Sequence, residues 1–163
     1  MAIESNTFRK ILVTIVIVLL HFGCQPQTKK PILHVNELQL SEIAIDGLKY
    51  TWTLSALKEE LDAPVEIIES NPTTKLILYE KNSIGIVDGK LNMLSGKRLR
   101  LSGVLVEDNI KFQDFASLYG LPKAAVQGVN SATRSYVVKL KDGYLKLTLA
   151  KKRIIGYMVY KEP

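Results

Sequence analysis

The sequence predicts an α+β fold of two tandem repeats, each with a strand, a helix and three antiparallel strands, and with the helices packed on sheet. Two segments 58 residues apart, 54–64 and 112–122, share apolar residues at helical spacing and end in Pro. Short runs of alternating apolar and polar residues follow each segment. Asp-Gly pairs, the strongest short signal for a hairpin, separate several of these runs.

The first repeat is assigned to residues 42–106. A short helix begins at Leu54, after Thr53 as its N-cap, and Pro64 stops it. Strands are expected over residues 43–52, 75–81, 84–87 and 90–94, with turns at Asp46-Gly47, Asn82-Ser83 and Asp88-Gly89.

The second repeat is assigned to residues 107–163, and strand residues over 97–112 lead into it. Its helix has an apolar stripe at Phe112, Phe115 and Tyr119, and Gly120 ends it. Strands are expected over residues 135–140, 144–149 and 154–160, with turns at Asp142-Gly143 and 151–153. In the middle strand, leucines alternate with Lys146 and Thr148, so the sheet should have one buried and one wet face.

Chance similarity of two amphipathic helices is the alternative to duplication, and two repeats can share one sheet or pack side by side. The tandem order over residues 43–160 resembles the repeat of beta-lactamase inhibitory protein. A single copy resembles the small outer-membrane assembly lipoproteins related to SmpA. The resemblance implies a non-catalytic domain that binds other proteins, although a fold does not fix a function.

Residues 1–23 have the pattern of a secretory signal peptide. Arg9 and Lys10 give a positive start, and residues 11–20 form an almost purely aliphatic run. The run is shorter than the roughly 20 residues that span a bilayer. Its terminal position and the polar residues that follow argue against a buried core element.

Gly23 and Cys24, directly after this run, resemble the lipobox of bacterial lipoproteins. The resemblance implies acylation of the Cys24 thiol with diacylglycerol, cleavage between Gly23 and Cys24, and acylation of the new amine. His21 and Phe22 depart from the family pattern, which prefers Leu and a small residue there. The alternative is a cleaved chain with a free thiol.

Two or three acyl chains anchor a protein stably to the lipid bilayer. In lipoproteins of bacteria with two membranes, Asp directly after the Cys holds the protein at the inner membrane, and Gln25 stands there instead. We therefore expect a lipid-anchored protein at the outer membrane, facing the periplasm. Residues 24–41 should be the lipidated Cys and a tether that can include a first strand. This compartment excludes nucleic acid as a partner.

Histidine and cysteine are too few for most catalytic or metal sites. After cleavage His34 is the one remaining histidine, and Cys24 carries lipid. Ser-His-Asp, Cys-His and zinc sites therefore lack residues, and the sequence has no phosphate or calcium loop motif. We expect no metal and no cofactor.

Paired carboxylates are the remaining route to an enzyme. Glu59 and Glu60 on the first helix, and Glu107 and Asp108 at a strand or turn, would suit a hydrolase of the cell wall. A solvated face explains both pairs, so we do not expect an enzyme.

The positive charge lies in the second half of the chain. Residues 107–163 hold 10 basic and 5 acidic residues, whereas residues 24–106 hold 10 of each. Candidate binding residues are the cations and tyrosines of the expected hairpins: Lys139, Lys146, Lys151, Lys152, Arg153, Tyr144 and Tyr157. Lysines that blunt exposed strand edges are the purely structural alternative.

Two functions fit these residues. One is a lipid-anchored, non-catalytic module that docks a periplasmic or outer-membrane protein through its sheet, since tyrosine suits protein interfaces. The other is an electrostatic binder of anionic lipid or glycan at the membrane surface. High salt should weaken the second steeply and leave the first largely intact.

The substitution Cys24→Ala should release the protein from membranes, because it removes the thiol that would carry the lipid. Membrane sedimentation after signal cleavage measures this. A cleaved variant that still sediments with the envelope would contradict the lipid anchor.

Overall fold

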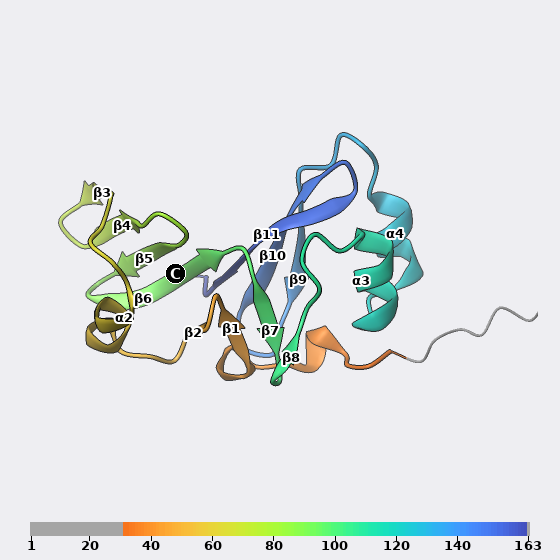
Figure 1. Ribbon diagram of the computed structural model, residues 1–163, viewed down its shortest axis with the longest axis horizontal. Coiled ribbons are helices and arrows are strands. Elements are labelled where there is room, and N and C mark those ends of the chain that lie inside the picture. Colours follow the sequence, from red (N-terminus) through yellow and green to blue (C-terminus); the bar gives the residue numbers. More distant parts are fainter. Residues whose placement is uncertain (1–30, 163) are drawn as a thin grey trace, which may run out of the picture.

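The structure is a computed structural model that describes residues 31–162. Within this range the fold is α+β, with two antiparallel sheets of four and seven strands and three short helices (Figure 1). The expected signal peptide, Cys24 and the start of the tether lie outside the described residues.

The larger sheet joins strands from both halves of the chain. Its order is β3-β4-β5-β6-β11-β10-β9, and every neighbouring pair is antiparallel. The strands are β3 (Glu66–Asn71), β4 (Thr74–Leu78), β5 (Ser83–Val87), β6 (Lys90–Gly96), β9 (Ser135–Lys139), β10 (Tyr144–Ala150) and β11 (Arg153–Tyr160). The pairing of β6 with β11 makes the two meanders one continuous sheet.

The smaller sheet is built from two short hairpins in the order β2-β1-β7-β8. The strands are β1 (Ile43–Ile45), β2 (Leu48–Lys49), β7 (Leu99–Leu101) and β8 (Val104–Leu105). Both hairpins turn through two residues with positive φ, and glycine is second in each: Asp46-Gly47 (52° and 89°) and Ser102-Gly103 (44° and 84°). These are the left-handed angles that match the twist of a tight hairpin.

The predicted helices form, and a third one follows them. Helix α2 (Leu54–Glu60) is capped by Thr53, whose hydroxyl accepts from the Ala56 amide at 3.2 Å. Helix α3 (Phe112–Leu118) ends before Gly120, which has a φ of 71°. The unpredicted helix α4 (Lys123–Gly128) begins directly after Pro122. Gly120 thus ends α3, and Pro122 is the residue from which α4 starts.

The core lies against one face of the larger sheet. Leu57 of α2 and Phe115 of α3 are fully buried, and the Phe112 ring packs 5.1 Å from the ring of Tyr136 on β9. Alternation along β10 is as predicted, because its inward leucines are buried: Leu145, Leu147 and Leu149.

The chain before β1 is packed rather than free. The Ile32 amide donates to the Leu118 carbonyl at 2.7 Å. Short 3₁₀ turns, η1 (Val35–Glu37) and η2 (Leu40–Glu42), place Val35 and Leu40 in the core. The tether expected over residues 24–41 is therefore too long, because apolar residues in its second part pack into the core.

Asp46 connects the two sheets. Its carboxylate accepts from the backbone amides of Lys97 and Arg98, each at 2.9 Å, just where the chain passes from β6 to β7. The amide of Asn82, in the β4–β5 turn, donates to it at 2.9 Å. The Asp46 side chain is 12% exposed, so these bonds are largely shielded from water.

The substitution Asp46→Ala should lower the free energy of unfolding by about 2–3 kcal/mol, because hydrogen bonds to a charged acceptor are lost. Asp88→Ala is the matched control. Asp88 holds the same place in the β5–β6 turn, with a φ of 49°, and its carboxylate makes no hydrogen bond or ion pair among the described residues. Urea denaturation measures both, and equal losses would contradict the connecting role of Asp46.

Candidate binding surfaces

The second face of the larger sheet is left open. Register places two rows of side chains on it, each crossing all seven strands. The first row is Ile68, Leu76, Gly85, Met93, Tyr160, Tyr144 and Lys139, and the second is Glu66, Leu78, Ser83, Ser95, Met158, Lys146 and Val137. None of these residues is buried. We call these two rows the open sheet face.

The middle of the open sheet face is apolar and aromatic. The rings of Tyr144 and Tyr160 stack with centroids 5.3 Å apart. Met93 lies over Gly85, where an added Cβ would meet the Met93 Cβ at 3.0 Å. Charged residues stand near the ends of the rows, apart from Lys146. Methionine and tyrosine with few charges form the composition of an interface core.

A hollow of about 380 Å³ lies beside the middle of the second row of the open sheet face. Ser83, Ser95 and Met158 of the second row line it, together with the β4–β5 turn. The hydroxyls of Ser83 and Ser95 hydrogen-bond to each other across the strands. The recess therefore places polar groups beside the apolar residues of the open sheet face.

The seven binding residues predicted from the sequence lie in three places: the open sheet face, the β10–β11 turn and, for Tyr157, the core. Lys139, Lys146 and Tyr144 lie on the open sheet face. Lys151, Lys152 and Arg153 lie at the β10–β11 turn, which closes the far end of the same hairpin.

Tyr157, predicted as a binding residue, lies in the core and is not accessible to a partner. Its side chain is 4% exposed, and its hydroxyl has no hydrogen-bond partner among the described residues. Burial raises the pKa of this hydroxyl. The cause is a β-bulge, because Thr148 pairs with Gly156 and Leu149 with Ile154. The extra residue, Ile155, shifts the alternation and turns Tyr157 inward.

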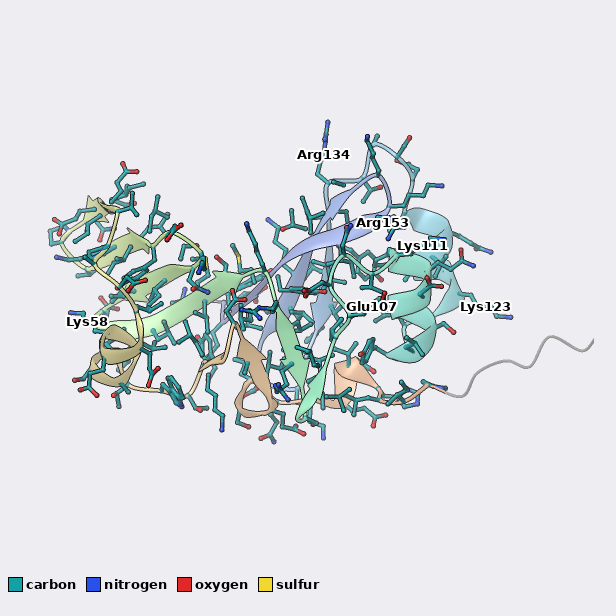
Figure 2. The ribbon with its side chains drawn as sticks, viewed as in Figure 1. Lys58, Glu107, Lys111, Lys123, Arg134 and Arg153 are labelled. Atoms are coloured by element: carbon teal, nitrogen blue, oxygen red, sulfur yellow. The ribbon has the colours of Figure 1, made fainter. Side chains whose placement is uncertain are left out.

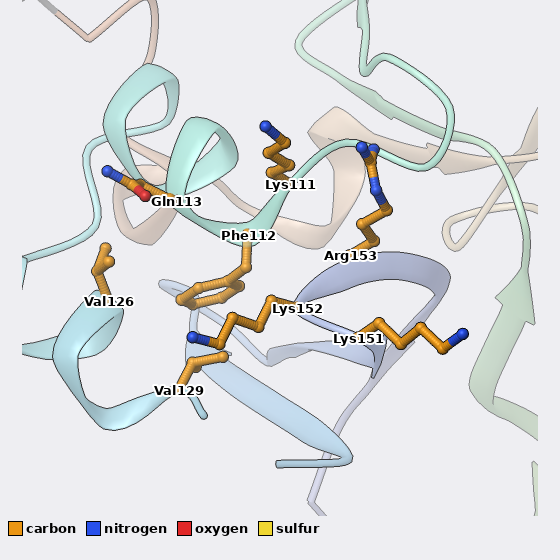
Figure 3. A pocket seen from close by; sticks show the side chains of 8 residues that line it. All are labelled: Lys111, Phe112, Gln113, Val126, Val129, Lys151, Lys152 and Arg153. Atoms are coloured by element: carbon orange, nitrogen blue, oxygen red, sulfur yellow. The ribbon is translucent and has the colours of Figure 1, made fainter. Parts of the chain in front are cut away.

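A basic pocket lies between the β10–β11 turn and helices α3 and α4 (Figure 3). Its volume is about 280 Å³, and its lining residues are Lys111, Phe112, Gln113, Val126, Val129, Lys151, Lys152 and Arg153. Four cations thus line the basic pocket together with the apolar side chains of Phe112, Val126 and Val129. Figure 3 shows Lys152 extending toward Phe112 and Val129, and Lys151 pointing away.

Hydrogen bonds fix the backbone of this basic pocket and the side chain of Arg153. The Phe112 amide donates to the Lys152 carbonyl at 2.9 Å. Lys111 and Arg153 form an isolated antiparallel β-bridge. The Arg153 guanidinium donates to the Asn109 carbonyl at 2.9 Å. Ion pairs within residues 31–162 are Lys75–Glu69 and Arg98–Asp46, so the lining cations have no carboxylate partner there.

The β10–β11 turn places two lysines in left-handed conformation. Lys151 has a φ of 48° and Lys152 a φ of 62°. Three other tight turns have glycine second: Gly47, Gly89 and Gly103. A side chain at such a φ costs on the order of 1 kcal/mol, so this turn keeps positive charge where a glycine would be more stable.

A second hollow of about 580 Å³ adjoins the basic pocket, and both are lined by Gln113 and Val126. Pro31 and His34 line its other side together with α3 and α4. The start of the described chain therefore lies beside this second hollow, at the opposite end of α3 from Phe112 of the basic pocket.

The carboxylate pairs are on different parts of the molecule. Glu59 and Glu60 are exposed on α2, and Glu107 and Asp108 are exposed between β8 and α3. Figure 2 places Glu107 toward the α3 end, away from α2. Across residues 31–162, three or more metal-binding side chains nowhere gather into a potential metal site. None of the helices in this range is long and apolar enough to span a membrane.

No protein family, curated protein or solved structure matches the chain. The surfaces therefore have to be interpreted from their own chemistry.

Sequence reasoning missed Lys111 and the apolar part of the basic pocket, because Lys111 and Lys152 are far apart in the chain and α4 was not expected. It also missed Met93, Met158 and Tyr160. Their signal was present, since each alternates with a buried residue in a strand that was predicted.

The substitution Lys152→Gly should raise the free energy of unfolding by about 1 kcal/mol, because it relieves the left-handed strain. Gly89→Lys, at the corresponding position of the β5–β6 turn, should lower it by a similar amount. A Cβ at Gly89 would meet no atom within 4 Å, so only its φ of 72° opposes the change. Thermal denaturation measures both. A lower melting temperature for Lys152→Gly would contradict the strain.

Proposed function

We propose that this chain is a lipid-anchored, non-catalytic module of the bacterial envelope that docks another protein on its open sheet face. The observation that carries the proposal is the uncovered first row of the open sheet face, which is apolar or aromatic, apart from Gly85, from β3 to β10 and ends in Lys139 on β9. A sheet with one face on the core ordinarily has a polar second face. Here Leu76, Met93, Tyr160 and Tyr144 occupy its middle.

The composition of the open sheet face favours a protein over a charged ligand. Lys146 is the one charged side chain in the rows between the edge strands, and stacked Tyr144 and Tyr160 offer rigid contact area at small entropic cost. Polar recognition comes from the rim, where Lys139 and Glu66 carry opposite charges.

The finer architecture, two tandem repeats, belongs to this proposal. In the smaller sheet the turns at 46–47 and 102–103 are 56 residues apart, and Ala44 pairs with Arg100, its counterpart at that offset. In the larger sheet the turns at 88–89 and 151–152 are 63 residues apart, and Ser95 pairs with Met158. Such self-counterpart pairs are expected where a two-fold axis relates duplicated halves, so both sheets support duplication.

The anchor rests on Cys24, with the outer membrane as the expected location. The second candidate function, binding of anionic lipid or glycan, is favoured by one observation, the basic pocket with its unpaired cations. The open sheet face and the basic pocket are distinct surfaces and can be tested separately.

A photo-crosslinking residue at Lys146 should give one discrete protein adduct in intact cells, because this position faces the docked partner. The same residue at Glu59, exposed on α2, is the matched control and should give none. Met93→Arg should abolish the adduct by placing an unpaired charge in the interface core. The adduct should survive high salt.

The charge variant Lys151→Glu, Lys152→Glu, Arg153→Glu should keep this adduct. Loss of the adduct in the charge variant, with retention in Met93→Arg, would contradict docking on the open sheet face. It would favour the electrostatic function instead.

A further inference from the structure

We propose that the basic pocket binds the phosphate of anionic phospholipid headgroups, so that the α3–α4 end of the molecule rests on the bilayer. The orientation rests on the proposed lipid anchor at Cys24, and the pocket chemistry is argued independently of it.

The described chain begins at this end of the molecule. Ile32 and Val35 donate their amides to the carbonyls of Leu118 and Tyr119, at 2.7 and 3.0 Å. Cys24 precedes Pro31 by seven residues, which span at most about 25 Å when fully extended. Helix α3 is only about 10 Å long, so an anchor at Cys24 leaves enough chain for the basic pocket to reach the headgroups.

The charge of this end suits an anionic surface. Figure 2 shows Lys111 and Arg153 side by side near α3, Lys123 at the outer end of the helices and Lys58 at the opposite end of the molecule. The basic pocket is lined by four cations and by no carboxylate. Lysine and arginine are attracted to an anionic leaflet only within a few ångströms to a Debye length of about 8 Å. An anchored chain can reach this distance, and the cations of the basic pocket would then hold it there.

The turn and the apolar part of the pocket both point to a bound anion with an apolar neighbour. Lys151 and Lys152 hold left-handed positions that Asp-Gly or Ser-Gly fill in the other tight turns. The turn thus combines backbone strain with two neighbouring positive charges. A bound anion would compensate for the strain and for the repulsion between the charges. Phe112, Val126 and Val129 give the pocket an apolar part, toward which Lys152 extends (Figure 3). An apolar surface beside a cation suits the glycerol and upper acyl region beside a headgroup phosphate.

Vesicle sedimentation of the mature chain with Cys24→Ser tests the basic pocket without the lipid anchor. The chain should bind vesicles of phosphatidylcholine with a quarter of phosphatidylglycerol, and should bind pure phosphatidylcholine vesicles weakly. The double substitution Lys151→Asn, Lys152→Gly should weaken this binding about thirtyfold, since each surface cation contributes roughly fivefold. It should also raise the melting temperature, which excludes unfolding as the cause.

The matched control is Lys49→Asn, Lys58→Asn, which removes the same charge from exposed positions on β2 and α2. Its binding should change by less than about threefold. Equal losses in the two double variants would overturn the proposal, because net charge alone would then explain binding. Indifference to phosphatidylglycerol would also overturn it. So would displacement by inorganic phosphate at the concentration of the lipid phosphate, which would assign the basic pocket to a soluble anion.

These experiments can contradict the lipid anchor and the lipid binding of the basic pocket independently of each other. Lipid-free binding to anionic vesicles, with no acylation of Cys24 in cells, would retain the pocket and remove the anchor. An acylated Cys24 together with a pocket indifferent to lipid charge would retain the anchor and overturn this inference.

Discussion

The pairing of β6 with β11 is the constraint on which the rest of the structure depends. It joins two meanders into one sheet, with Ser95 opposite Met158, and so decides which side chains face the core. Directly after this pairing the chain leaves β6 at Gly96 and enters the smaller sheet. Asp46 holds that crossing through the amides of Lys97 and Arg98. Gly96 is required there, because a Cβ would collide with the Asp46 carboxylate.

One covered face and one open face follow from this arrangement. Helices α2 and α3 contribute Leu57 and Phe115 to a single core on one side of the larger sheet. No described element covers the other side, whose residues are all at least partly exposed. Exposed apolar side chains in contiguous rows are uncommon on isolated soluble proteins and mark interaction sites. Packing within the described residues therefore does not explain why the open sheet face is apolar.

Local signals predicted most of the fold, whereas long-range contacts decided the sites. The strands at 135–139, 144–150 and 153–160 and the Thr53 cap could be predicted, because alternation and capping depend on near neighbours. Strand β3 was missed because all six of its residues are exposed and only its pairing with β4 holds it. The bulge at Ile155 and the meeting of Lys111 with Lys152 depend on tertiary pairing, which no short pattern encodes.

The β10–β11 hairpin couples the two proposed surfaces mechanically. Tyr144 on the open sheet face and Ala150 beside the charged turn are the two ends of β10. At about 3.3 Å for each residue, the strand separates them by roughly 20 Å. Because β10 is paired on both sides, this distance is rigid. A turn seated on headgroups would thus hold the aromatic row at a set height above the bilayer. In that arrangement the strained lysine turn would influence partner docking through position, without touching the partner.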